Sequence, residues 1–294
     1  MENLFLDPYT ILLLAGFIGF FMAFGIGAND VANSMGTSVG SKAITIKQAI
    51  IIAAIFEFAG AFLAGGEVTS TIRKGIIDPQ LYENDINISV IGMLSALLAG
   101  GTWLYVASLR GWPVSTTHTI VGSIIGFALI TKGVDAVSWG KVGNIAMSWV
   151  TSPLFSGTLA FGLYISAKKL ILDRSNPGEA AIKYIPFYSF LVAAVISLVT
   201  ARKGLKHVGI EFSDNEVYLF IAIFSSLVGL ATAFFLRNNK QQIMREGGIE
   251  FAFGLLMIVS ASAMAFAHGS NDVANAIGPL AAIVSVVDTG AIGS

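Results

Sequence analysis

Apolar residues fill this chain in long runs rather than in the narrow stripes of a soluble amphipathic helix. Several runs approach the roughly 20 residues that cross a bilayer as an α-helix. We predict membrane helices at residues 10–28, 47–66, 88–109, 145–172, 184–200, 217–236 and 249–267. Two further apolar segments, 68–77 and 113–130, are short or open with polar residues, which favours broken or re-entrant helices. The pattern predicts an all-α integral membrane protein.

Composition and charge agree with this fold class. Hydrophobic residues make up 55% of the 294 residues and charged residues only 12%, about half the share typical of soluble domains. A formal net charge of −1 provides no basic footprint for nucleic acid, so we expect no nucleic-acid partner. The absence of cysteine excludes disulfides, thiolate metal sites and a cysteine nucleophile. We expect a multi-pass protein surrounded by the lipid bilayer.

An internal repeat is the most informative feature of the chain. Residues 23–36, AFGIGANDVANSMG, and residues 265–278, AFAHGSNDVANAIG, are identical at nine of 14 positions, at an offset of 242 residues. Two copies of an apolar helix followed by a polar, glycine-containing segment are typical of transporters built from inverted repeats, in which paired interruptions mark the binding site. We therefore predict an internally duplicated transporter, with a first repeat at 1–172, intervening loops and membrane helices at 173–248, and the start of a second repeat at 249–294.

The repeated polar segment has the residue types of an ion site. Each copy has the form Gly-x-Asn-Asp-Val-Ala-Asn, and we expect its glycine to let the helix unwind and free backbone carbonyls. Hard oxygen ligands that include a carboxylate suit an alkali cation. The candidate sodium ligands are Asn29, Asp30, Asn271 and Asp272. One helical turn further on, the amides of Asn33 and Asn275 are candidate donors to a bound anion.

The alternative for these segments is a purely structural one. Asparagine and aspartate are favoured helix caps, and glycine ends many helices. A carboxylate inside a membrane costs roughly 2.5–3.5 kcal/mol on insertion scales, however, so two copies beside apolar helices favour a binding role. Glu57 lies within the apolar run 47–66 and is a further candidate, as a third cation ligand or a proton carrier. A packed, protonated acid is the alternative for Glu57.

A second polar cluster, Pro-Val-Ser-Thr-Thr-His at 113–118, opens a short apolar segment. We expect Pro113 in the first turn of a helix, where a missing N–H leaves no bond unmade. The hydroxyls of Ser115, Thr116 and Thr117 then lie at the positive end of that helix, which is a ready anion site. The alternative is a Ser/Thr-capped helix whose histidine packs inside the bundle. Neither kind of motif contains lysine or arginine, so a bound anion depends on helix ends, hydroxyls, amides and cations.

Taken together, these motifs resemble the inorganic phosphate transporter (PiT) family. The resemblance rests on GANDVANS at 27–34, TIRKGIID at 71–78, PVSTTH at 113–118 and GSNDVANA at 269–276, and it extends from about residue 15 to the end of the chain. It implies secondary transport of inorganic phosphate coupled to sodium or protons, usually by a homodimer, and not an enzyme.

The resemblance also implies roles for individual residues. Asp30 and Asp272 correspond to cation ligands, Glu57 to an acid that transport requires, and residues 115–117 to phosphate contacts. The leading hypothesis is a sodium-coupled phosphate symporter in the cell membrane, with Na⁺ as its coupling ion. Proton coupling, or transport of sulfate, stays open because helix ends and hydroxyls bind either tetrahedral anion.

A channel and an intramembrane aspartyl protease are more distant alternatives. A protease dyad needs one protonated and one ionised carboxyl, whereas the two aspartates here have matching neighbours in sequence. One feature departs from a complete duplication: Ser115 follows Asn29 by 86 residues, which places a second hydroxyl motif near position 357, beyond Ser294. We therefore expect these residues to be part of a longer transporter that holds one complete ion-and-hydroxyl half and the start of another.

Overall fold

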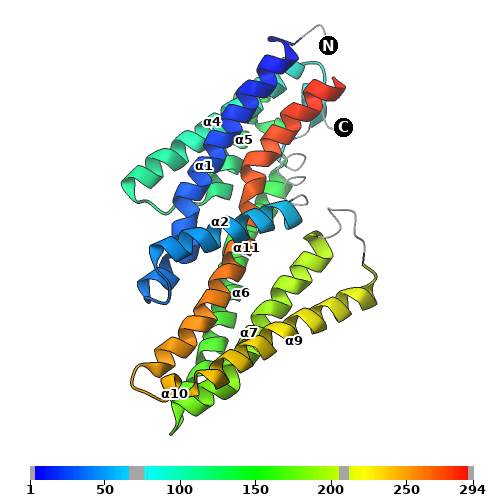
Figure 1. Ribbon diagram of the computed structural model, residues 1–294. Helices are drawn as coiled ribbons and strands as arrows, with labels where there is room; N and C mark the ends of the chain where they lie inside the picture. Colours follow the sequence, from blue (N-terminus) through cyan, green and yellow to red (C-terminus); the bar gives the residue numbers. More distant parts are fainter. Residues whose placement is uncertain (1–3, 66–75, 78, 205–211, 291–294) are drawn as a thin grey trace. The chain divides into compact units, whose positions relative to one another are not determined.

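The computed structural model describes residues 4–65, 76–77, 79–204 and 212–290, and the regular secondary structure within them is helical (Figure 1). The predicted segment at 68–77 and the TIRKGIID motif lie almost entirely outside the described residues. Within the described ranges, seven helices are long and apolar enough to cross a membrane. The predicted all-helical membrane fold is confirmed at this level.

The helices follow the predicted apolar runs. In chain order they are α1 (Pro8–Gly40), α2 (Ile46–Ala64), α4 (Ile86–Arg110), α5 (Thr116–Lys132), α6 (Trp139–Ala167), α7 (Pro177–Val199), α9 (Asp214–Asn238), α10 (Lys240–Ile243) and α11 (Gly248–Thr289). Each of the seven predicted runs coincides with one long helix, and a π-helical turn, Lys168–Leu172, extends α6. The remaining helix of more than one or two turns, α5, has 17 residues.

The structure corrects the prediction that the Asn-Asp motifs unwind. Helix α1 has 33 residues and α11 has 42, and each continues through its copy of the motif, at 27–33 and 269–275. One glycine lowers helix stability by only about 1 kcal/mol, and neither motif contains proline, so the i→i−4 hydrogen bonds persist. The backbone carbonyls are therefore engaged in the helix, and ligands at these motifs come from side chains.

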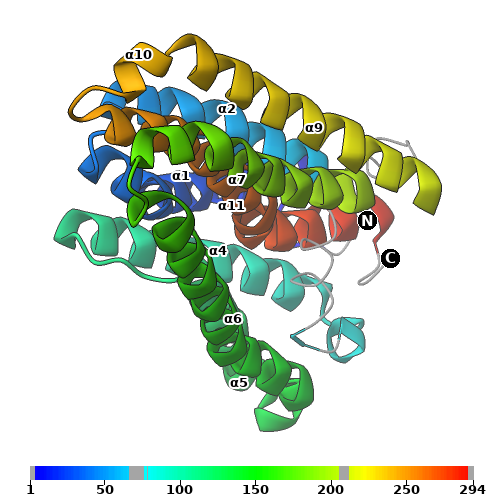
Figure 2. The ribbon, with the colours of Figure 1, turned by 90° about the horizontal axis from the view of Figure 1, so that it is seen from below.

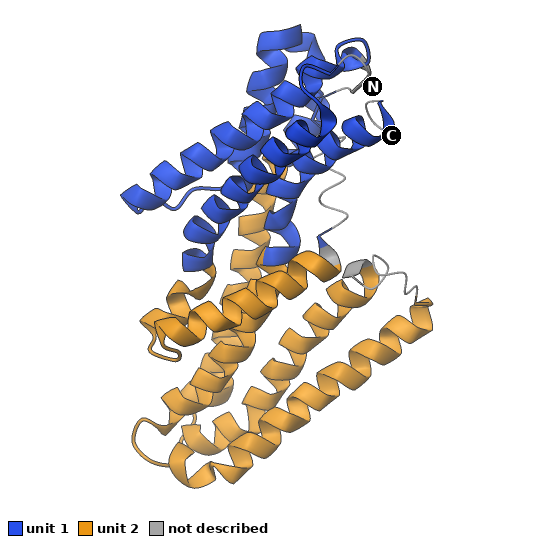
Figure 3. Cartoon of the chain, turned by 45° about the horizontal axis from the view of Figure 1, so that its top comes forward, with its two compact units in different colours: residues 1–33, 65–145, 269–294 blue, residues 34–64, 146–268 orange. Residues whose placement is uncertain are grey.

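Two compact units make up the chain (Figure 3). The first gathers Met1–Asn33, Gly65–Ile145 and Gly269–Ser294, and the second gathers Ser34–Ala64 and Ala146–His268. Helices α1 and α11 are each divided between the two units. These units describe packing, whereas the predicted boundaries after residues 172 and 248 describe a duplication of sequence, and they stay a prediction.

The first unit packs the beginning of α1, all of α4 and α5, and the end of α11 around one apolar core. Fully buried members include Met22 of α1, Leu97 and Leu104 of α4, Ile124 of α5 and Ile283 of α11. This core fixes the orientation of α1, α5 and α11, which carry the polar motifs.

Close approach between α1 and α4 depends on Gly101. A Cβ placed there would lie 2.7 Å from a ring carbon of Phe21 and 3.3 Å from the Cα of Met22, so backbone as well as side chain would have to move. We expect Gly101→Ala to lower the free energy of unfolding by about 1–3 kcal/mol, the usual effect of overpacking. Gly16→Ala on α1 is the matched control, because no atom lies within 4 Å of its Cβ position. Equal thermal stability of the two variants would contradict this packing.

The second unit is built on a hairpin of α7 and α9, which run side by side (Figure 1, Figure 2). Its core joins Ile185 of α7, Leu236 of α9, Ile243 of α10 and Ala252 of α11. Gly229 lets α9 approach α7 closely, since a Cβ there would lie 3.3 Å from the carbonyl oxygen of Pro186. The hairpin therefore positions the start of α11 within this unit.

Candidate functional site

Asn29 joins α1 to the turn between α4 and α5. Its Nδ2 donates hydrogen bonds to the carbonyl of Trp112 at 2.9 Å and to Oγ of Ser108 at 3.4 Å. Its Oδ1 accepts a hydrogen bond from the N–H of Val114 at 3.2 Å. An amide oxygen has two lone pairs, so one is left for a cation. The buried Asn29 side chain thus holds in place the hydroxyl motif that follows this turn.

Asp30 contacts that hydroxyl motif directly. Its side chain is buried in α1, and the hydroxyl of Thr116, the first residue of α5, donates a hydrogen bond to Oδ2. Two motifs 86 residues apart in sequence therefore meet. A threonine hydroxyl carries a single proton, so while it donates to Asp30 its oxygen offers only lone pairs to other ligands. Such an oxygen beside a carboxylate is suited to a cation.

Asp272 has an equivalent polar neighbourhood in the end of α11. Nδ2 of Asn275 donates to Oδ1 of Asp272 at 3.0 Å and to the hydroxyl oxygen of Thr117 at 3.3 Å. Asn275 is 1% exposed, and these two bonds use both of its N–H donors. Its carbonyl oxygen, rather than its N–H₂ group, is then the part available to a ligand.

The two aspartates face one another. A carboxylate oxygen of Asp30 and one of Asp272 lie within 4.8 Å of each other. At about 4 Å, two like charges near a protein surface repel by about 4 kcal/mol, and by more in a drier setting. Neither motif supplies a lysine or arginine to offset this repulsion. The arrangement is therefore suited to a bound cation.

Helix α5 begins at Thr116, beside the carboxylate of Asp30 and three residues after Pro113. Ser115 is its N-cap, and the Ser115 hydroxyl oxygen accepts a hydrogen bond from the N–H of His118 at 3.3 Å. Pro113 lies outside the first turn, contrary to the prediction, because the N–H of Val114 is bonded to Asn29 and the chain stays extended through Ser115. The first N–H groups of a helix have no acceptor within it, so α5 presents donors to an anion.

The two repeats are not equivalent at their asparagines. The structure buries Asn29 and exposes its counterpart Asn271, whereas it exposes Asn33 and buries its counterpart Asn275. Asn33 and Asn271 therefore lie outside the buried cluster, and their predicted binding roles stay predictions.

Glu57 has a partner that sequence reasoning missed. Within the second unit, Nδ1 of His268 lies 3.1 Å from Oε1 of Glu57, and the two side chains are 13% and 20% exposed respectively. The repeat contained a signal for His268, because this residue stands where the first copy has Ile26. A histidine is thus paired with an acid inside the apolar helices.

Among the described residues, seven helices are long and apolar enough to cross a membrane, and the first unit holds a pair of carboxylates. These features define a multi-pass membrane protein with a polar site. Over residues 26–294 the chain matches the phosphate transporter family. A Haemophilus influenzae protein named "Putative phosphate permease" is 52% identical over 287 residues, with 95% of this chain and 68% of the relative covered. The Arabidopsis thaliana "Inorganic phosphate transporter 2-1, chloroplastic" is 40% identical over 294 residues, with 93% of this chain and 50% of the relative covered.

A solved structure described as "The sodium-dependent phosphate transporter" has the same fold. It superposes with a TM-score of 0.88 at 38% identity, over 97% of this chain and 70% of the other. This chain belongs to the phosphate transporter family. The family consists of transporters, which sets aside the protease alternative.

Proposed function

We propose that this protein is a secondary active transporter that moves inorganic phosphate across a membrane by symport with sodium. The observation that carries the proposal is the pair of carboxylates, one from each sequence repeat, whose oxygens lie within 4.8 Å. The sodium dependence named in the description of the solved relative supports the choice of ion.

The cation site is formed by oxygens of the first unit. Asp30 and Asp272 supply the negative charge, and the hydroxyl oxygen of Thr116 and the amide oxygens of Asn29 and Asn275 complete the set. Hydrogen bonds at Asp30 and Asp272 orient these groups before the ion arrives. Sodium accepts such neutral and anionic oxygen ligands and cancels a charge that the membrane interior disfavours. Asn271 and Glu57 stay candidates for a further ion.

The phosphate site lies at the start of α5. Its donors are the N–H groups of Thr116 and Thr117, which have no acceptor within the helix, and the hydroxyl proton of Ser115. The exposed amide of Asn33 is a further candidate donor. Thr116 belongs to both sites, because its hydroxyl binds Asp30 while its N–H faces the anion. Sodium and phosphate are therefore coupled through one residue.

Two hydroxyl variants separate these roles. Ser115→Ala removes a hydroxyl proton that serves the anion, together with the cap bond from the N–H of His118, so we expect phosphate affinity to fall more than sodium affinity. Thr116→Val removes the hydrogen bond to Asp30, so both affinities should fall. A lost hydrogen bond to a charged group corresponds to about 1.5–3 kcal/mol, or at least about tenfold in affinity. Thr116→Ser keeps the hydroxyl and is the control. Identical effects of Ser115→Ala and Thr116→Val in isothermal titrations would contradict this division.

Proton coupling is the second candidate, and the contact between Glu57 and His268 favours it. An acid and a histidine that share a proton inside a membrane are typical of proton pathways. Phosphate accumulation in proteoliposomes driven by a pH gradient at equal sodium on both sides would support this candidate. Accumulation that follows only a sodium gradient would support the leading proposal.

The proposal also covers the membrane topology and the oligomeric state. We infer an inverted repeat in which α5 is re-entrant, since 17 helical residues extend about 26 Å and the hydrocarbon core is roughly 30 Å thick. We also propose a homodimer in the cell membrane, on the strength of the family resemblance. Cysteine accessibility at both ends of α5 tests the first point, because a re-entrant helix exposes both ends to one side. The mass of the detergent-solubilised protein tests the second.

Uptake of labelled phosphate into proteoliposomes tests the function itself. The expected result is accumulation above equilibrium with an inward sodium gradient at fixed pH, and exchange of internal against external phosphate. Counterflow with sulfate in place of phosphate measures anion selectivity. Uptake that never exceeds equilibrium and does not saturate would favour a channel and contradict symport.

A further inference from the structure

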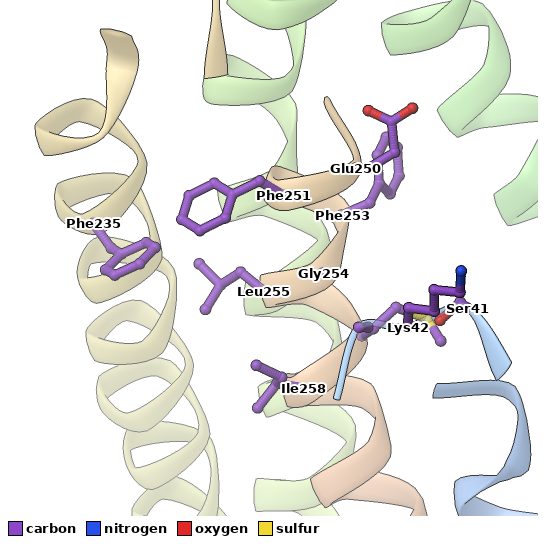
Figure 4. A pocket seen from close by; sticks show the side chains of 11 residues that line it. Ser41, Lys42, Phe235, Glu250, Phe251, Phe253, Gly254, Leu255 and Ile258 are labelled. Atoms are coloured by element: carbon purple, nitrogen blue, oxygen red, sulfur yellow. The ribbon is translucent and has the colours of Figure 1, made fainter. Parts of the chain in front are cut away.

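A cleft of about 520 Å³ lies in the second unit, away from the polar motifs (Figure 4). Its volume falls within the range of small-molecule sites. Phe235 of α9 stacks on Phe251 of α11 with ring centroids 5.9 Å apart, and Leu255 and Ile258 continue the apolar wall. In Figure 4 the side chains of Phe251, Leu255 and Ile258 project from α11 toward α9. The cleft is therefore apolar along most of its length.

Two opposite charges border the same cleft. Lys42 and Glu250 both line it, and both side chains are exposed. Neither forms an ion pair with any other residue in the part of the chain that the structure describes. The cleft thus combines an aromatic wall with one exposed ammonium and one exposed carboxylate.

The cleft lies where membrane helices end. Lys42 follows the end of α1 by two residues, Phe235 is in the last turn of α9, and Glu250 is in the first turn of α11. The apolar runs 217–236 of α9 and 249–267 of α11 match the hydrocarbon core, so Phe235 and Glu250 at their ends lie at the level of the lipid headgroups. An occupant of the cleft at this depth has lipid tails on one side and water on the other.

Lys42 has a backbone conformation that lysine rarely adopts. Its φ is 61°, the only positive φ of a non-glycine residue among the described residues. The turn is held by bonds from the N–H of Lys42 to the carbonyl of Val39 and from the N–H of Ala43 to the carbonyl of Ser38. Glycine normally occupies this position after a helix because it carries no Cβ. A lysine maintained against this strain points to a use for its ammonium group.

We propose that the cleft binds a phospholipid with an amino headgroup, such as phosphatidylethanolamine. Lys42 contacts the lipid phosphate, Glu250 accepts hydrogen bonds from the lipid ammonium, and Phe235 and Phe251 contact an acyl chain. A purely anionic lipid would meet the carboxylate of Glu250 without a partner for it. Choline headgroups offer no N–H to that carboxylate, so they bind more weakly.

Native mass spectrometry of the delipidated full chain tests this proposal with phosphatidylethanolamine, phosphatidylcholine and phosphatidylglycerol in turn. Phosphatidylethanolamine should bind most tightly. Lys42→Gln should lower the affinity for phosphatidylethanolamine about fivefold, which is the upper range for the loss of an exposed ion pair. Lys47→Gln is the matched control, because Lys47 is exposed on the first turn of α2 and does not line the cleft. Glu250→Gln should shift the preference towards phosphatidylglycerol, since the cleft then carries only a positive charge.

Lys42→Gly separates lipid binding from folding. Glycine relieves the backbone strain at this turn, so the variant should have unchanged or higher thermal stability. Its affinity for phosphatidylethanolamine should nevertheless fall. Equal lipid affinity of Lys42→Gln and Lys47→Gln, or equal binding of the three lipids by the unmodified chain, would overturn the proposal. A dimer population that falls with Lys42→Gln while lipid binding is unchanged would assign the cleft to a contact between copies, and would overturn it as well.

Discussion

Asp30→Asn and Asp272→Asn are each expected to abolish sodium-driven phosphate uptake while the protein stays folded. Asparagine keeps the shape of the side chain, and its amide oxygen still accepts the hydrogen bond that Thr116 donates to Asp30. The substitution removes only the charge, which in the proposed site holds the cation. Because two carboxylate oxygens lie within 4.8 Å of each other, neutralising one also relieves repulsion in the ion-free protein. Thermal stability without sodium should therefore be unchanged or higher.

The same variants should lose the response of stability to sodium. An ion that binds only the folded protein raises its stability by mass action, and this increment disappears with the site. Asp288→Asn is the matched control, since Asp288 is an exposed aspartate near the end of the same helix, α11. Normal uptake by both Asp30→Asn and Asp272→Asn, with an intact sodium-dependent thermal shift, would reduce these residues to structural roles.

Helix positions could be predicted from sequence because a helix needs about 20 consecutive apolar residues to cross a bilayer, and such runs are visible in the chain. The ends of the helices are harder to predict, as α11 illustrates. Its apolar run ends near residue 267, yet the helix extends to Thr289 through the polar motif. The low helix propensity of glycine alone predicts that the helix unwinds at Gly269. Inside a membrane, an unwound backbone must find new hydrogen-bond partners, so the helix continues where none is supplied.

The identity of the polar residues could be predicted, but not their pairing. The repeat indicated Asp30 and Asp272 as an equivalent pair, and the structure places their carboxylates together. Asn29 bonds to the carbonyl of Trp112 and the N–H of Val114. These are backbone groups, so residue types in the sequence do not indicate the pairing. The contact of Glu57 with His268 joins residues 211 positions apart, beyond the reach of any local pattern.

Sodium and phosphate are expected to bind cooperatively, with phosphate affinity about a hundredfold higher when sodium is present. Without cations, the anion at the start of α5 would lie close to two carboxylates in a poorly hydrated setting. Sodium bound at the proposed site offsets the charges of Asp30 and Asp272 and leaves the N–H groups of Thr116 and Thr117 to serve phosphate. A factor of a hundred corresponds to a coupling free energy within the usual 1–3 kcal/mol of linked sites.

Reciprocity makes this coupling testable from both sides, because phosphate must raise sodium affinity by the same factor. Isothermal titration with phosphate in sodium, and in a large organic cation at equal ionic strength, measures the first effect, and sodium titration with and without phosphate measures the second. Thr116→Val should reduce both effects, since its hydroxyl bond to Asp30 links the two ligands, while Thr116→Ser should preserve them. Phosphate affinity that is unchanged between the two cations would mean that the carboxylates and the helix end act independently, and that sodium does not drive this transporter through Asp30 and Asp272.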